Sequence, residues 1–351
     1  ESGGLGAVDL ASGLQASRAI GKALGCRGSL KRCLQRAPAK ALTGQTYSFG
    51  WGPHVDGVTV PAAPLEMLRQ GRINPVNVMM GAQTNDTFRE LSKQYTGPDG
   101  QLVPLSVDSY VQALAAQVGL RFLKKAMELY PADHANLVRN VQQLGSLGSD
   151  RNLCSIRRRI SLVNKHRPGH AYMYRFNWWY KSNPECSAEP NYHPDFLGSV
   201  HEDETTFVMG QPIFMFQGAC CGKWGAKLTR EPCAQSPACV SCWRPDFGEG
   251  YHAYFNEKEW EFSKLVSGCW AAFAATGSPS GRTNGSGVDA VQWPEFGNGG
   301  PVHRNIVLDA DLPGQSAVEV TPYNNPSICA FWDTLDDPVS VSSNGATIIE
   351  V

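Results

Sequence analysis

The sequence has almost no excess charge of either sign and no long apolar run. Its 351 residues carry a formal net charge of -1, which argues against a general electrostatic preference for nucleic acid or anionic membranes. No stretch of about 18 consecutive apolar residues occurs, so a membrane-spanning helix is not expected. Charged residues make up 18% and hydrophobic residues 42% of the chain, a composition that excludes a disordered protein and allows a sizeable buried core.

The start of the chain lacks the marks of a complete precursor. It begins at Glu1 rather than Met, and no charged segment with an apolar core precedes the first predicted helix. We therefore expect a fragment or a processed chain. Because a secretion signal would lie upstream, its absence here carries no information about the compartment.

Cysteine is abundant for a cytosolic enzyme, with 11 residues in the chain. Cys26 and Cys33 form a close pair, and a second group crowds one short stretch: Cys220, Cys221, Cys233, Cys239 and Cys242. Such clusters indicate either disulfides in an oxidising compartment or a metal site. The C-x-x-C pattern of Cys239 and Cys242 would need a second ligand pair to bind zinc, and adjacent cysteines suit one metal poorly. The sequence favours disulfides, with zinc as the alternative.

Hydrophobic periodicity predicts alternating helices and strands. Helical patterns cover residues 10–24, 65–70, 106–130, a further stretch to about 144, another after 154, and 257–275. Val76–Met80 and His170–Phe176 have the composition of short strands. This alternation predicts an α/β sheet covered by helices on both faces. We expect one domain over residues 1–351, with a Cys-rich surface insertion at about 218–250.

Asp86 and His201 are candidates for the acid and base of a serine hydrolase. Such chemistry on an α/β sheet needs a nucleophilic Ser on a sharp strand-to-helix turn, then an acid, then a His. Asp86 lies six residues after the apolar run ending at Met80, and His201 follows the strand ending at Phe176. Because the chain holds eight histidines and many acids, some ordered pair is inevitable. From position alone, a surface Asp and an ordinary loop His remain the alternative.

Ordered motifs across nearly the whole chain are more specific than this pair. Gly198–Gly210, which contains His201, matches "G-x-x-H-G-x-E-x-x-F-V-F-G" at the same spacing, and Trp270–Pro279 matches "W-A-N-F-A-R-T-G-x-P". Further matches are Leu24–Cys26 with Cys33–Gln35, Gly52–Gly57, Val78–Gly81 with Asn85–Asp86, Asp150–Cys154, Tyr172–Phe176, Trp293–Pro294 and Cys329–Trp332. The chain therefore resembles the C-terminal part of a type-B carboxylesterase, a cholinesterase-like α/β-hydrolase.

The resemblance implies an α/β-hydrolase fold that is incomplete here, with the N-terminal half of the sheet absent. It implies cleavage of small-molecule carboxylic esters through an acyl-enzyme, without a metal or cofactor and without nucleic acid as a partner. His201 would be the base and Asp86 the acid that orients it. Glu204 would either position the His201 loop or serve as a structural hydrogen-bonding group. The resemblance and the cysteines together predict a secreted or extracellular protein.

The nucleophile is expected before residue 1. Ser2–Gly3 resembles the end of a G-x-S-x-G turn, but the family has a second Ser-Gly turn after the next core strand, at the same distance from Cys26. Placing the nucleophile at Ser2 would require the loss of that central strand, which would leave unpaired backbone groups in the sheet. Ser2 is therefore the less favoured alternative.

The resemblance also pairs cysteines. It implies disulfides Cys26–Cys33 and Cys154–Cys329, and a buried free thiol at Cys269. Six cysteines remain, with a connectivity that the sequence does not fix: Cys186, Cys220, Cys221, Cys233, Cys239 and Cys242.

Three positions depart from the family pattern. Asp86 stands where Glu is usual, Thr87 replaces the Gly after the acid, and Glu202 replaces the Gly after His201. The changes after the acid and the base would alter loop geometry, and Glu202 would favour a protonated imidazole if it lies close. The rival to an esterase is a non-catalytic adhesion or binding module, since esterase-like domains of that kind exist in this family; an inactive fragment is a third hypothesis.

Overall fold

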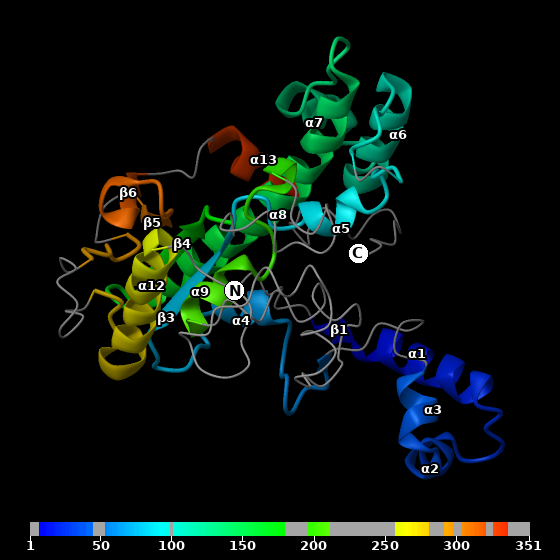
Figure 1. Cartoon of the computed structure of the whole chain (residues 1–351). Coiled ribbons are helices and arrows are strands. Elements are labelled where there is room, and N and C mark those ends of the chain that lie inside the picture. Colours follow the sequence, from blue (N-terminus) through cyan, green and yellow to red (C-terminus); the bar gives the residue numbers. More distant parts are fainter. Residues whose placement is uncertain are drawn as a thin grey trace, which may run out of the picture. The chain divides into compact units, whose positions relative to one another are not determined.

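The computed structural model describes residues 7–44, 53–98, 101–179, 195–210, 257–280, 291–297, 303–320 and 326–335. The chain divides into two compact units, with the boundary between Pro75 and Val76 (Figure 1). The expected insertion at 218–250 lies outside the described residues. None of the described helices is long and apolar enough to cross a membrane.

The smaller unit is built from short helices and a two-stranded parallel sheet. Its elements are β1 (Val8–Asp9), α1 (Leu10–Ala23), α2 (Leu30–Arg36), α3 (Ala39–Thr43), β2 (His54–Val55) and α4 (Pro64–Arg69). Asp9 caps α1 by accepting a hydrogen bond from the Ser12 amide at 2.9 Å. The predicted Cys26–Cys33 disulfide is present and joins the end of α1 to α2.

The larger unit holds a four-stranded sheet. Its order is β3 (Val78–Gln83), β4 (Ala171–Phe176), β5 (Arg304–Leu308) and β6 (Ser316–Val320), with the first three parallel and β6 antiparallel. The strand predicted at Val76–Met80 begins and ends later than expected, because pairing with β4 continues to Gln83, opposite Phe176. The loops after β3 and β4 leave the same edge of the sheet, since parallel strands place their carboxyl ends together.

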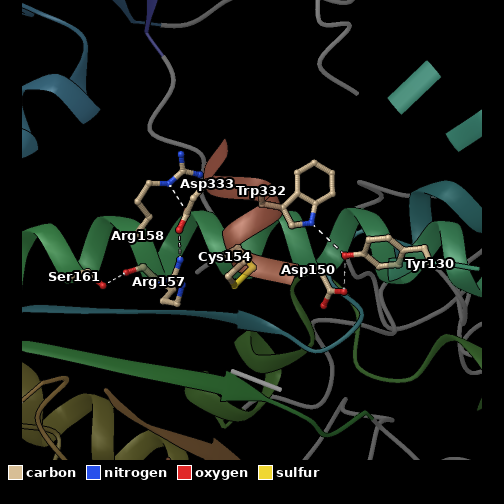
Figure 2. The surroundings of a disulfide bond; sticks show 9 residues. Tyr130, Asp150, Cys154, Arg157, Arg158, Ser161, Trp332 and Asp333 are labelled. Carbon is tan, nitrogen blue, oxygen red and sulfur yellow. Dashed lines mark hydrogen bonds and ion pairs between the residues drawn. A yellow bond between two sulfur atoms is a disulfide. The ribbon is translucent and has the colours of Figure 1, made fainter. Parts of the chain in front are cut away.

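Helices cover both faces of this sheet, as the alternating pattern predicted. Alternate residues of β4 (Tyr172, Tyr174 and Phe176) pack with α9 (Asp203–Met209) and α12 (Glu257–Thr276) in one hydrophobic cluster. The long helix α8 (Leu137–His166) runs along β3 and β4 (Figure 2), and strand alternation assigns it to the opposite face. Further short elements of this unit are α5 (Phe88–Ser92), a 3-10 turn at Asp195–Leu197 and another at Pro313–Gln315.

Two helix predictions need correction. The helix predicted over residues 106–130 is two helices, α6 (Val107–Val118) and α7 (Leu123–Leu129), because Gly119 takes a left-handed φ of 79° and ends the first. The helix predicted to stop near residue 144 instead continues as α8 over 30 residues. Gly145 does not break it, and its missing side chain makes room for Phe88, whose ring would meet a Cβ there at 2.4 Å.

The last described helix, α13 (Pro326–Leu335), is fastened to α8 by a covalent bond and by charge. The predicted Cys154–Cys329 disulfide is present, and Figure 2 shows Asp333 directed at two arginines of α8. Arg157 Nη2 contacts Asp333 Oδ2, and Arg158 Nε lies 3.2 Å from Asp333 Oδ1. These contacts join segments that are far apart in the sequence.

Candidate functional site

The loop after β3 is joined to the loop before α9 by hydrogen bonds. Thr84 extends the strand pairing, its amide donating to the Phe176 carbonyl at 3.0 Å. The Asn85 amide donates to the Ser199 carbonyl at 2.8 Å, and the Asn85 side chain donates to the Leu197 carbonyl at 2.8 Å. Residues separated by more than a hundred positions in sequence are therefore held side by side at the carboxyl edge of the sheet.

Asp86 and His201 meet at this edge. His201 Nδ1 lies 3.2 Å from Asp86 Oδ1, and the His201 amide donates to the Asp86 carbonyl at 3.1 Å. The Asp86 side chain is 2% exposed and the imidazole is 55% exposed. A carboxylate only accepts, so Nδ1 carries the proton and Nε2 is left with a lone pair for an incoming proton. This is the geometry of a base and the acid that orients it.

A third residue, Asn152 on α8, holds the other side of the Asp86 carboxylate. Its side-chain amide donates to Asp86 Oδ2 at 2.7 Å. Each oxygen of the acid therefore has a donor, one from the base and one from the helix beneath. Sequence reasoning missed Asn152, because a single polar residue within a long helix carries no motif.

The electrostatic setting favours the protonated imidazole. The hydrogen bond to Asp86 is the main cause that raises the pKa of His201, and the negative charges of Asp86, Glu202 and Glu204 act in the same direction. Partial burial opposes them and is the second largest influence. These carboxylates stabilise the imidazolium that forms when His201 takes up a proton.

Glu204, on α9, is a buried carboxyl group. It accepts hydrogen bonds from the Gln83 side chain on β3 and from the Tyr174 hydroxyl on β4, the second at 3.4 Å. Burial raises the pKa of Glu204 above its ordinary value. These contacts connect α9 to both strands whose loops carry Asp86 and His201. They are hydrogen bonds of the kind that the structural hypothesis for Glu204 predicts.

Asp203 fixes the turn that carries His201. Its carboxylate accepts from the Val200 amide at 2.7 Å and lies 3.5 Å from Arg89 Nη2. The side chain of Asp203 is 2% exposed, so this ion pair is largely shielded from water. The base is thus placed by contacts on both sides of it in the sequence.

Comparison with known families agrees with this architecture. The sequence profile described as "Carboxylesterase family" matches residues 6–219, which is more than half of the chain and includes both Asp86 and His201. The chain belongs to the carboxylesterase family.

Individual relatives within this family are distant. Acetylcholinesterase 1 of Caenorhabditis briggsae and that of Caenorhabditis elegans are each 21% identical over 329 residues, which cover 86% of this chain and 44% of the relative. Human neuroligin-2 is 23% identical over 216 residues, covering 57% of this chain and 25% of its own length. The chain therefore spans less than half the length of these curated relatives.

The two positions where the carboxylesterase pattern has Gly behave differently. Thr87 has a φ of -93°, which any residue adopts, and its hydroxyl donates to the Gly145 carbonyl at 3.4 Å. Glu202 has a φ of 75°, in the left-handed region that favours Gly. Only the second replacement forces a residue with a side chain into an unfavourable backbone conformation.

Other predicted residues lie outside the dyad or outside the described part of the chain. Cys269 is a buried free thiol, as expected. Trp178, which follows β4, is buried in the hydrophobic cluster that contains the β4 aromatic residues. Ser2, the segment with the C-x-x-C pattern and the six cysteines of open connectivity fall outside the described residues.

Proposed function

We propose that this chain supplies the acid and base of a serine hydrolase that cleaves small-molecule carboxylic esters. The observation that carries the proposal is the contact between His201 Nδ1 and Asp86 Oδ1 at 3.2 Å, with a buried acid and an accessible ring. Membership of the carboxylesterase family supports the reaction class.

In this proposal a Ser hydroxyl attacks the ester carbonyl while His201 Nε2 takes its proton. The imidazolium then returns that proton to the leaving alcohol, and an acyl-enzyme remains. His201 next takes a proton from water, whose oxygen attacks the acyl carbonyl. The imidazolium then gives that proton to the departing Ser oxygen, which releases the carboxylic acid and restores the Ser hydroxyl. Throughout, Asp86 holds the tautomer and stabilises the imidazolium.

The nucleophile of the proposed triad precedes residue 1. The chain order Ser, Asp, His belongs to the α/β-hydrolase fold, whose oxyanion donors come from the residue after the nucleophile and from an earlier loop. We therefore propose that the whole protein has the α/β-hydrolase fold, and that the remaining strands of its sheet precede this chain. The two disulfides, together with the acetylcholinesterase and neuroligin relatives, support a secreted or extracellular location for the whole protein.

A non-catalytic adhesion or binding module is the second candidate. The observation that favours it is the similarity to neuroligin-2. A binding surface does not require a matched base and orienting acid, and the contact between Asp86 and His201 therefore favours the hydrolase.

Labelling with a fluorophosphonate probe tests the proposal, because the probe reacts only with an activated Ser. The protein to use is the chain together with the sequence that precedes Glu1. We expect labelling that disappears in His201→Ala and persists in His170→Ala. His170 is the matched control, since its Nδ1 contacts the side chain of Asn77 rather than a carboxylate.

Absent labelling of the longer wild-type protein would overturn the hydrolase and favour the binding module. The 351-residue chain alone tests the position of the nucleophile. If that chain is labelled, and the label is lost in Ser2→Ala, the nucleophile lies at Ser2 and not upstream.

A further inference from the structure

Glu202, directly after the base, has a backbone conformation that is costly for its residue type. Its φ and ψ are 75° and -2°. Among the described residues only Glu202 and Gln315 combine a side chain with a left-handed φ. Strain of this kind persists where the surrounding structure imposes it, and it is common at functional sites.

Contacts on both sides of Glu202 impose this conformation. The His201 amide is bound to the Asp86 carbonyl, and Asp203 is bound to the Val200 amide. The Glu202 carbonyl accepts from the Thr205 amide at 3.0 Å, which begins α9. The chain must therefore reverse within one residue, and Gly would do so without strain.

Among the residues that the structure describes, the Glu202 side chain has no contact that offsets the strain. It makes no hydrogen bond that caps α9, and within the described part of the chain no ion pair engages its exposed carboxylate. What the residue does bring is a negative charge next to the base.

The other described acidic groups around His201 already have partners. Asp86 bonds to the ring itself, Asp203 is paired with Arg89, and Glu204 is buried between the strands. Glu202 is the acidic neighbour of the base that remains exposed to solvent. Its charge contributes to the raised pKa of His201, after the larger effects of Asp86 and burial.

We propose that Glu202 is an electrostatic positioning residue, whose negative charge stabilises the imidazolium of His201. This functional gain explains why a residue with a side chain occupies the left-handed turn directly after the base. The proposal rests on the proposed function, because the imidazolium forms when the base takes the Ser proton. The same charge keeps the free base protonated to a higher pH. The acid limb of kcat/KM therefore lies at higher pH than it would with a neutral residue at this position.

The test is an NMR titration of His201 in the chain together with the sequence that precedes Glu1, with wild type, Glu202→Gln and Glu202→Gly compared at low salt. Gln removes the charge and keeps the strain, whereas Gly removes both. We expect both variants to lower the pKa of His201, and only Gly to raise the melting temperature, by about 2 °C. Gln315→Gly is the control, since it relieves the same kind of strain elsewhere and must leave the titration of His201 unchanged.

An unchanged pKa of His201 in Glu202→Gln would overturn the proposal. So would a lowering that persists undiminished at about 1 M salt, because a charge effect through solvent is screened there. The titration needs no ester turnover. Failure of the fluorophosphonate labelling together with a lowered pKa would therefore count against the hydrolase alone, and not against the charge effect.

Discussion

At the scale of single residues, the acid is held from two sides rather than by the base alone. Asp86 has a side chain one methylene shorter than the Glu that is usual in the family pattern. Its backbone carbonyl accepts from the His201 amide, so the two loops approach closely enough for the shorter side chain to reach the ring. Asn152 then occupies the remaining carboxylate oxygen.

Loss of Asn152 should therefore impair catalysis more than stability. In Asn152→Ala the carboxylate of Asp86 is free to turn from the ring, and we expect kcat to fall about tenfold with KM unchanged. Steady-state kinetics on the protein with its preceding sequence measures this. The matched control is Asn140→Ala on the same helix, where the lost hydrogen bonds go to the Leu105 and Asp133 carbonyls.

The control should lower the melting temperature and leave kcat near the wild-type value. A kcat for Asn152→Ala that equals the control, alongside an inactive Asp86→Asn, would show that the acid needs no support from α8.

The sequence predicted Asp86 and His201 because each lies in a segment with a recognisable motif. Asn152 could not be predicted in that way. Its partnership with Asp86 arises from the path of α8 beneath a loop 66 positions away, and no local pattern records that crossing.

At the scale of elements, the contact between α8 and α13 contains a partly buried carboxyl group, that of Asp150. The Trp332 indole donates to the Tyr130 hydroxyl at 3.2 Å, and that hydroxyl donates to Asp150 Oδ2 at 2.9 Å (Figure 2). Burial raises the pKa of Asp150 to about 6, against a partly opposing hydrogen bond from Tyr130.

This shift makes stability depend on pH in a defined direction. The folded pKa of Asp150 lies above its value in the unfolded chain, so the folded state binds the proton more tightly. That contribution is complete below about pH 4 and is lost as the pH rises through about 6. Above pH 6 the folded protein holds a partly buried negative charge at Asp150.

Asp150→Asn should therefore stabilise the protein at pH 7.5 by about 2 kcal/mol and have little effect at pH 4.5. The Asn oxygen still accepts from Tyr130, which keeps the network intact. Thermal melts of both proteins at the two pH values measure the difference. An equal effect at both would show that Asp150 is not protonated in the folded state at low pH.

Among the elements, those with strong local signals were predicted well. Residues 10–24, 170–176 and 257–275 correspond closely to α1, β4 and α12. The continuity of α8 was not foreseen. Gly145 and Gly148 disfavour a helix locally. Their presence within α8 is explained by the close approach of Phe88 to Gly145 and of Thr87 to Gly148, which leaves no room for a side chain.

At the scale of the whole molecule, the dyad lies entirely within the larger compact unit. Both of its loops leave the same edge of one parallel sheet, and α8, α9 and the strands fix them from below. The chain covers 44% of the length of its acetylcholinesterase relatives. In our proposal, Asp86 and His201 form one part of a larger catalytic site.

The alternation of helices and strands predicted the general architecture, and the motifs predicted the carboxylesterase family, to which the chain belongs. The order of the four strands could not be predicted, since pairing between distant segments leaves no periodic signal. The two disulfides followed from the resemblance and are present.

Hydrolysis of a p-nitrophenyl ester tests the central claim most directly. The protein that includes the sequence before Glu1 should turn the ester over, and both Asp86→Asn and His201→Ala should reduce kcat by about 10³- to 10⁴-fold. Circular dichroism would confirm that the variants remain folded. Folded variants that retain the wild-type kcat would contradict the account.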